Sequence, residues 1–262
     1  MATYPTGHVR ASNKDHLIAL AQRRHRFMAG PVTPLPPAWD SVSQGWVGAI
    51  KDQAQCGSCW DFSGTGMIEI AYNKAGLGPI VLSEEYTLSC CRNGGCNGDD
   101  NVTVLEWAKK TGLPTTADYG PYAGRPQQCA FRNSMTLYKV NDWGFCDNAG
   151  GNGVAPVDTI KAAIMQHGSA GSAIAADDAF MNIRPGTVFH GSGSRDINHD
   201  IILVGWDDTK GAWILRNSWG TSWVDGGYCW IAYGANQVGT EAVWCQVDNI
   251  NPPVDVPWLI AP

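Results

Sequence analysis

The sequence predicts an α+β fold of two lobes, a helical lobe followed by a β-rich lobe. The first half alternates helical runs with glycine-rich loops, whereas the second half carries one helical run and then several apolar, β-branched runs. A glycine-rich stretch, "DNAGGNGVAP", separates the halves. Helices followed by strands are typical of α+β folds, in which the two kinds of element are segregated.

Residues 1–34 form a separate basic segment ahead of this fold. Residues 14–28 place apolar side chains at helical spacing between basic ones, which predicts an amphipathic helix, and "AGPVTPLPP" ends it. The segment contains one acidic residue, Asp15, against the basic residues Arg10, Lys14, Arg23, Arg24 and Arg26. Since the whole chain has a formal net charge of -6, a basic arm precedes an acidic body on which it can dock.

Three helical runs are expected in the helical lobe, about residues 35–147. The first begins after Ser58, and the second is opened by Ser83 as N-cap, with two glutamates in its first turn. The third, "VTVLEWAKKTG", has two lysines in its last turn and Gly112 as a stop. Favourable caps therefore support each of these helices.

The β-rich lobe, about residues 148–250, begins with a helix in which Val157, Ile160 and Ile164 lie at helical spacing. Four runs then indicate strands: "HDIILVGW", "AWILRN", "GYCWIAY" and "EAVWCQV". "DDTKG" is expected to form the hairpin loop between the first two. Residues 251–262 are expected to form a C-terminal tail on the surface.

Composition excludes several classes of function. A net charge of -6 argues against nucleic acid as a partner, because phosphate binding needs clustered Lys and Arg. No apolar window is long enough to span a membrane. Nine cysteines are many for a reduced cytosolic protein, so a secreted or extracytoplasmic location is expected. "MATYPTGHVRASNKD" lacks the apolar region of a secretion signal.

The stretch "QAQCGSCWDFSGTG" places Cys56 and Cys59 three positions apart, and four uses are open. A thioredoxin-type redox pair would follow a strand, whereas the preceding segment is loop-like. A zinc site would need two more ligands, which "CCRNGGC" offers without a second CxxC pair. Both cysteines can instead be structural. In the fourth use Cys59 is a nucleophile at a helix N-terminus, where free N–H groups and the helix dipole favour the thiolate.

A nucleophilic thiol needs a base, and one histidine differs from the rest. The others lie in the basic segment, at a helix end or in a loop: His8, His16, His25, His167 and His190. His199 begins an apolar strand, and Asn217 in "RNSWGTSW" is expected on the neighbouring strand. The asparagine amide can accept the imidazole N–H and orient the ring toward Cys59, which completes a set of nucleophile, base and orienter.

With these residues in place, the chain resembles the papain family of cysteine peptidases through a series of motifs in order: "QAQCGSCWDFS", "LSEEYTLSC", "GGCNG", "YGPYAG", "INHDIILVGW" and "NSWGTSWVDGGY". His199 follows Cys59 by about 140 residues, as in that family. The resemblance covers roughly residues 35–250. It implies a helical lobe and an antiparallel β-barrel-like lobe with the active-site cleft between them.

The resemblance also implies an activity: an endopeptidase that cleaves peptides or proteins through a thiolate and an acyl-enzyme, with exopeptidase action left open. Position by position, Cys59 becomes the nucleophile, His199 the general base and acid, and Asn217 the orienter. The Gln53 side chain and the Cys59 backbone N–H become the oxyanion donors, and Trp219 shields the Asn–His hydrogen bond. No metal or cofactor is implied, and a monomer is expected.

The same resemblance implies the disulfides Cys56–Cys96 and Cys90–Cys129, which leaves Cys59 as a thiol. The third bridge usual in the family has no cysteine to start from here, because the stretch before His199 reads "HGSGSRDI". The remaining cysteines can be grouped as Cys91–Cys146 and Cys229–Cys245, although connectivity does not follow from sequence.

The resemblance places one set of residues in the substrate-binding cleft: Gly57, Ser58, Asn97, Gly98, Asp99, Asp100, Ala173, Ile197, Asn198, Asp200 and Trp219. Asp99 and Asp200 replace small or apolar residues usual in the family. With Asp100, they predict an acidic pocket that selects Lys or Arg at the second residue before the cut, or the amino group of a short peptide. Alternatively, Asp99 and Asp100 cap the third helix and Asp200 faces away.

Two further expectations concern the basic segment and Asp61. Residues 1–34 resemble a short prosegment that can inhibit by lying across the acidic cleft. Asp61 stands where a small residue is usual, and the sign of its effect on the nucleophile stays open. Two alternatives to hydrolysis also remain: a transpeptidase or ligase that uses the same site, and a non-catalytic binding protein with a peptidase fold.

Overall fold

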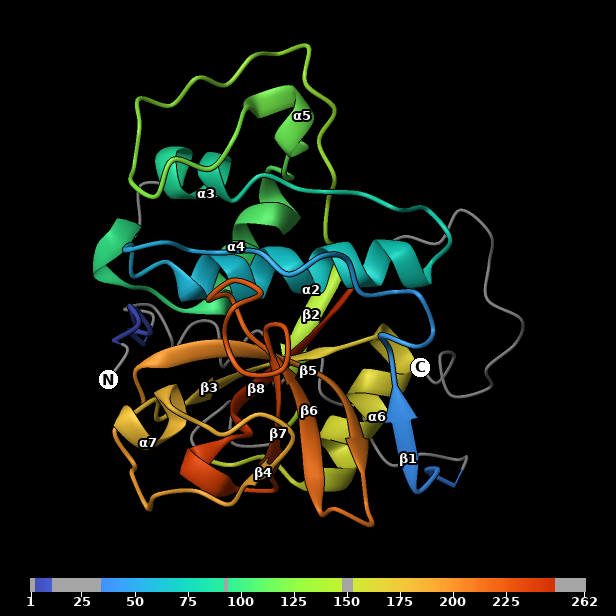
Figure 1. Cartoon of the computed structure of the whole chain (residues 1–262). Helices are drawn as coiled ribbons and strands as arrows, with labels where there is room; N and C mark the ends of the chain where they lie inside the picture. The colour runs from blue at the N-terminus through green and yellow to red at the C-terminus, as the bar shows by residue number, and fades with distance from the viewer. Residues whose placement is uncertain (1–2, 11–33, 92–93, 148–152, 248–262) are drawn as a thin grey trace.

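The computed structural model describes residues 3–10, 34–91, 94–147 and 153–247. Helices α2 to α5 gather on one side of the molecule, and most strands lie on the other side together with α6 and α7 (Figure 1), so the two-lobe α+β fold is confirmed. The predicted helix at residues 14–28 and the tail at residues 251–262 lie outside the described residues.

The helical side is built around one long, buried helix. It comprises α2 (Cys59–Lys74), α3 (Glu84–Cys90), the 3-10 turn η2 (Gly95–Asn97), α4 (Asn101–Lys110) and α5 (Thr116–Tyr119). As predicted, α3 is capped by Ser83, whose Oγ accepts a hydrogen bond from the Tyr86 backbone N at 3.1 Å. Met67 and Ile68 of α2 share a core with Leu105 of α4, which holds α2 in the centre of this lobe.

The other lobe is an extended, mostly antiparallel sheet. Its strands are β1 (Ala38–Asp40), β2 (Asp142–Phe145), β3 (Ala170–Ile174), β4 (Val188–Phe189), β5 (His199–Asp207), β6 (Ala212–Arg216), β7 (Tyr228–Ala232) and β8 (Thr240–Gln246). Their order is β2-β8-β3-β5-β6-β7-β4, with β1 beside β5, and only β4 and β7 pair in parallel. The path does not return from β4 to β2, so the sheet stays open. The lobe also contains α6 (Val157–His167), α7 (Asp178–Met181) and the 3-10 turn η3 (Ala235–Gln237).

Strand β5 separates two hydrophobic cores. Ile202 and Val204 belong to the core that includes α2, whereas Ile201 and Leu203 belong to the core of the β-rich lobe. Successive side chains of a strand point to opposite faces, so a continuous apolar run is what a strand between two cores requires. His199, the first residue of β5, therefore lies where the two lobes meet.

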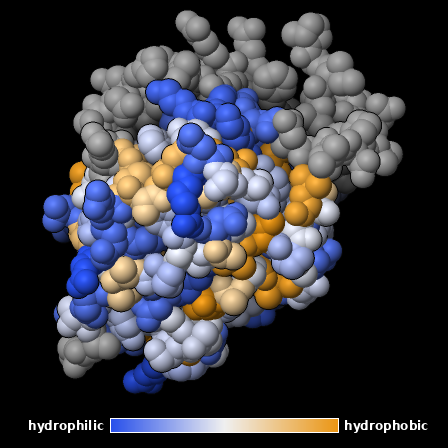
Figure 2. Space-filling view, turned by 90° about the horizontal axis from the view of Figure 1, so that it is seen from above, coloured by the Kyte–Doolittle hydropathy of each residue, from blue (hydrophilic) through white to orange (hydrophobic). Residues whose placement is uncertain are grey.

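The surface is mixed in character. Figure 2 shows hydrophilic and hydrophobic residues interspersed over the face seen from above. Across the described ranges, no helix has both the length and the apolar character needed to cross a membrane.

Candidate active site

Cys59 is the first residue of α2 and is fully buried. Burial raises the pKa of its thiol, and the negative charge of Asp200 raises it further. Backbone N–H groups of Asp200, Gly7 and Trp60 hydrogen-bond the sulfur and oppose this rise. The helix N-terminus expected to favour the thiolate is present, but burial beneath residues 3–10 favours the protonated thiol.

His199 and Asn217 are brought together by the pairing of β5 with β6. The His199 Nε2–H donates to the Asn217 Oδ1 at 2.8 Å, and the Ser218 backbone N donates to the same oxygen at 2.8 Å. Burial lowers the pKa of His199 to about 4, although the bond to Asn217 acts in the opposite direction. Among the described residues, the His199 Nδ1 has no hydrogen-bond partner, so it can accept a proton from a thiol.

Trp219 covers this histidine. Its ring stacks on the His199 imidazole with 4.4 Å between centroids, and Tyr4 stacks on Trp219 at 4.6 Å. Both His199 and Trp219 are at most 2% exposed. The Asn–His hydrogen bond is therefore shielded from water, as the resemblance implies for this tryptophan.

Gln53 is oriented as an oxyanion donor should be. Its Oε1 accepts from the Ser218 Oγ at 2.6 Å, which fixes the orientation of the amide. Its Nε2 then donates to the carbonyl oxygens of Cys56 at 2.9 Å and of Pro5 at 3.2 Å. Trp219 Nε1 also donates to the Pro5 oxygen, at 3.1 Å. The Gln53 amide N–H is therefore already hydrogen-bonded to a peptide carbonyl of the same chain, that of Pro5.

Residues 3–10 lie between the two lobes (Figure 1), and the contacts of Tyr4 with Trp219 and of Pro5 with Gln53 place them over the site. Gly7 N and His8 N donate to the Asn198 oxygen at 3.1 and 2.9 Å. Val9 N donates to the Asp99 oxygen at 2.8 Å, and Asp99 N donates to the Gly7 oxygen at 2.9 Å. This part of the basic segment is extended and bound through its backbone, in the manner of a peptide added beside a strand.

At Gly7 and Gly98, the backbone of residues 3–10 packs directly against the backbone of the peptidase domain. A Cβ at Gly7 would lie 1.9 Å from the Gly57 oxygen, and a Cβ at Gly98 would lie 2.5 Å from the Gly7 oxygen. Gly98 also has a φ of +99°, which side-chain-bearing residues rarely adopt. Glycine at these positions is therefore what allows the chains to approach so closely.

Asp99 and Asp100 do cap α4. The Asp99 Oδ1 accepts from the Asp100 backbone N at 2.8 Å and from the Thr103 Oγ1 at 2.9 Å. The Asp100 Oδ1 accepts from the Val102 backbone N at 3.1 Å. Burial raises the pKa of Asp99 and, more strongly, that of Asp100, which also feels the charges of Glu241 and Asp200. The expected capping role thus holds for Asp100, the N-cap of α4, and Asp99 supports the same turn through Thr103.

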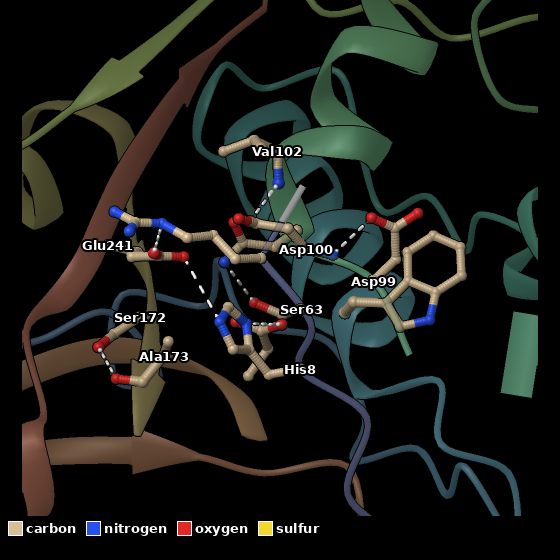
Figure 3. A network of polar contacts seen from close by, with 12 residues as sticks. His8, Ser63, Asp99, Asp100, Val102, Ser172, Ala173 and Glu241 are labelled. Carbon is tan, nitrogen blue, oxygen red and sulfur yellow. Dashed lines mark hydrogen bonds and ion pairs between the residues drawn. The ribbon is translucent and has the colours of Figure 1, made fainter. Parts of the chain in front are cut away.

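Asp200 does not face away, and it meets a histidine that sequence reasoning dismissed. The His8 Nδ1 lies 3.0 Å from the Asp200 Oδ2, and the His8 Nε2 lies 3.5 Å from the Glu241 Oε2 (Figure 3). Burial alone would lower the pKa of His8, but the charges of Asp200, Asp100 and Glu241 outweigh it and raise the pKa to about 9. His8 and Glu241 were missed because a histidine in a basic arm and a glutamate inside "TEAVWCQV" carry no local signal.

The other expected cleft residues are more ordinary. Ser58 is buried, and its Oγ lies 2.7 Å from the Tyr122 OH. Ala173 lies opposite Asp200 in the β3–β5 pair. Asn97 ends η2, and Ile197 is partly buried just before β5. Within the ranges that the structure describes, no group of three or more His, Cys, Asp or Glu side chains is arranged to hold a metal ion.

Asp61, which stands where a small residue is usual next to the nucleophile, has one hydrogen-bond partner within its own helix, while its Oδ2 is buried without one among the described residues. Its Oδ1 accepts from the Thr65 Oγ1 at 3.0 Å, one turn along α2. Burial raises the pKa of the Asp61 carboxyl well above its usual range, and the charge of Glu84 adds to this rise. A carboxyl that tends to stay neutral can occupy this interior at little cost.

The structure contains the disulfides Cys56–Cys96 and Cys90–Cys129. The groupings Cys91–Cys146 and Cys229–Cys245 are wrong, since these four are buried thiols. Three strands lie between β7 and β8 in the sheet, so Cys229 and Cys245 are not on neighbouring strands, whereas a disulfide requires Cα atoms within about 7 Å. Cys146 lies in the β-rich core, whereas Cys91 directly follows α3 in the helical lobe.

Comparison with known proteins gives a consistent result. The family model described as "Papain family cysteine protease" matches residues 35–248. Cysteine proteinase 2 of Zea mays is 34% identical over 82% of this chain and 60% of its own length, and cathepsin K of Mus musculus is 31% identical over 82% and 64%. A solved structure from work on the mite allergens Blo t 1 and Der p 1 has a TM-score of 0.75 at 26% identity, covering 84% of this chain and 73% of that one. The chain thus spans only about three fifths of the length of the curated relatives it matches.

Proposed function

The chain belongs to the papain family of cysteine proteases, and from this premise we propose that it hydrolyses peptide bonds with Cys59 as nucleophile. The observation that carries the proposal is the Gln53 amide, which already donates to a peptide carbonyl, that of Pro5, beside a buried Cys59 and a His199–Asn217 pair. Donors aimed at a carbonyl oxygen next to a nucleophile are what acyl transfer needs.

Each step of the proposed reaction uses one of these groups. The Cys59 thiol gives its proton to His199, and the sulfur bonds to the carbonyl carbon while Gln53 and the Cys59 N–H hold the oxyanion. The C–N bond then breaks, and His199 protonates the departing amine. A water molecule, deprotonated by His199, forms a C–O bond with the acyl carbon. The C–S bond breaks as the tetrahedral intermediate collapses, His199 returns its proton to the Cys59 sulfur, and the acid product is released.

Under this proposal, residues 3–10 inhibit the enzyme. They are not cleaved, because their chain runs through the cleft in the direction opposite to that of a substrate. A substrate fills the acidic pocket with a residue before the cut and places its departing amine near His199 and Trp219. In the segment the order is reversed: Tyr4 and Pro5 lie at Trp219, and His8, later in the chain, fills the pocket. The amine that follows the Pro5 carbonyl is thus on the pocket side, where His199 is not positioned to protonate it.

We also propose that the acidic pocket favours a basic side chain at the second residue before the cut. The support is that Asp200 already accepts from a histidine inside the pocket, at 3.0 Å, with Asp100 and Glu241 adding negative charge. A basic residue in this position can replace the hydrogen bond that Asp200 now accepts from His8, whereas an apolar residue would lose it.

A fluorogenic peptide library varied at the second residue before the cut tests this proposal. We expect kcat/KM for Lys, Arg and His to exceed that for Leu by roughly tenfold, and Asp200→Ala to remove most of this preference. Asp118→Ala, an exposed aspartate on α5, is the matched control and should leave the preference unchanged. A wild-type enzyme that cleaves Leu or Phe peptides faster than basic ones would show the basic preference to be wrong.

The remaining expectations stay proposals. We propose a peptidase domain at residues 35–250, a prosegment-like region at residues 1–34, a monomer, and an extracytoplasmic location. Two disulfides in a chain of 262 residues support an oxidising compartment.

A further inference from the structure

The acidic pocket contains a carboxylate that the sequence did not indicate, and its position restricts what the pocket can hold. Asp200 stands on β5 and Glu241 on β8, and both strands pair with β3, which runs between them. Two strand spacings separate the backbones of the two acids by roughly 10 Å. A group that touches both carboxylates must therefore present donors on two opposite edges.

His8 meets this requirement with its two ring nitrogens. Its Nδ1 lies 3.0 Å from Asp200 and its Nε2 lies 3.5 Å from Glu241 (Figure 3), and the three side chains are 5%, 1% and 6% exposed. Protonated imidazole has two N–H donors that point away from each other. The ring thus bridges the two strands as a buried cation with a carboxylate on each edge.

The surroundings of His8 are strongly negative. The carboxylates of Asp200 and Glu241 lie against the ring. Asp100 at the start of α4 lies near them, with a pKa that burial raises well above its usual range, and Asp99 beside it is engaged with Thr103. Among the described residues, Arg10 brings a positive charge to this region: it is half exposed at the rim and lies 3.0 Å from Glu241. His199 also faces it, but burial lowers the pKa of its imidazole to about 4 and favours the neutral form. Cys59, the other titratable group nearby, is a neutral thiol in this state.

We propose that Asp200 and Glu241 form a clamp that selects a protonated histidine at the second residue before the cut, with Glu241 as a specificity-determining residue. This proposal rests on the peptidase function proposed above and names its substrate class: peptides with histidine in that position. Lysine offers a single point charge, and arginine carries its donors farther from the backbone than histidine does, so neither matches a clamp already closed on an imidazole.

The test uses the full chain and fluorogenic peptides that differ only in His, Arg, Lys or Leu at this residue. Residues 3–10 compete equally with every peptide, so the ratio of two kcat/KM values is independent of how many sites are open. At pH 5.5 the His-to-Leu ratio should be roughly tenfold and should exceed the ratios for Arg and Lys.

The pH dependence separates a clamp for imidazolium from a general preference for histidine. Free histidine has a pKa near 6.5, so the cationic form of the substrate disappears above this pH and the His-to-Leu ratio should fall by about tenfold by pH 8.5. The Arg-to-Leu ratio should stay level, because arginine remains charged. Ionisation of Cys59 and His199 affects all the peptides alike and cancels in the ratios.

Glu241→Gln keeps the shape of the side chain and should lower the His-to-Leu ratio at pH 5.5 by about tenfold. Asp118→Asn, the matched control, changes an exposed acid on α5, away from His8, and should change the ratio by less than about twofold. If Arg or Lys is preferred to His and Glu241→Gln leaves the ratio unchanged, the clamp is wrong while the basic preference survives. If Leu exceeds all three basic residues, both proposals are wrong.

A second measurement does not depend on hydrolysis. In the full chain, His8→Leu and His8→Lys should each speed alkylation of Cys59, His8→Leu by about tenfold, because the side chain that fills the clamp is lost or mismatched. In a Glu241→Gln background His8→Leu should have a much smaller effect. Equal alkylation rates for the wild type and His8→Leu would overturn the clamp even if no peptide were cleaved.

Discussion

Replacing Gly7 with alanine is expected to switch the full chain from a covered to an open form, with peptide hydrolysis and Cys59 alkylation both faster by at least about tenfold. The added Cβ would lie 1.9 Å from the Gly57 oxygen and 2.7 Å from the Gly57 Cα. Both contacts are with backbone that leads directly into α2, so neither chain can move aside without losing its other contacts. Rates of hydrolysis and of alkylation measured on the same preparation check this result.

The matched control for this prediction is Gly48→Ala. Gly48 is exposed, has no atom within 4 Å of an added Cβ, and precedes the site on the same stretch of chain. It should leave both rates as they are in the wild type. If Gly7→Ala and Gly48→Ala gave the same rates, residues 3–10 would not be what limits access to Cys59.

Gln53→Ala is expected to lower kcat by about 100- to 1000-fold with little change in KM, since one oxyanion donor acts mainly on the transition state. The Gln53 side chain is fully buried and is held by the Ser218 Oγ, so its amide needs no reorganisation to reach the oxyanion. Because Gln53 also binds the Pro5 carbonyl, the substitution loosens the segment as well. Rates must therefore be divided by the number of open sites, titrated with a thiol-directed peptidyl epoxide.

Gln55→Ala serves as the matched control, because Gln55 is a glutamine two residues away with an exposed side chain. Its kcat per open site should stay within about threefold of the wild type. A Gln53→Ala enzyme that retained the same kcat would place the oxyanion donors elsewhere, and the role of Gln53 would have to be abandoned.

Local patterns in the sequence were enough to predict the elements with strong caps or periodicity. Helices α2, α3, α4 and α6 and strands β5 to β8 form where apolar spacing and capping residues place them. Strand β3, "AGSAI", was not predicted, because its alanines and glycine have no β preference of their own. It forms because β5 and β8 pair with it on both sides.

The site was predictable only in part, because local sequence patterns indicate some of its residues but not the contacts between distant parts of the chain. Cys59, His199 and Asn217 were identified from their positions at a helix start and near strand ends, which are local features. The contact of His8 with Glu241 joins residues at opposite ends of the chain, and no local pattern encodes it. Four cysteines were paired wrongly because only the strand order shows that Cys229 and Cys245 cannot meet.

The most direct test of the central claim is mass analysis of the full chain after reaction with the peptidyl epoxide. The chain has five thiols, all of them buried, so burial alone does not distinguish Cys59 from the others. Cys59 differs in its place at the start of α2, near Asp200, which directly follows His199 in the chain. We therefore expect one adduct per chain, located on Cys59. The absence of an adduct on Cys59, or adducts spread over the other four thiols, would contradict it.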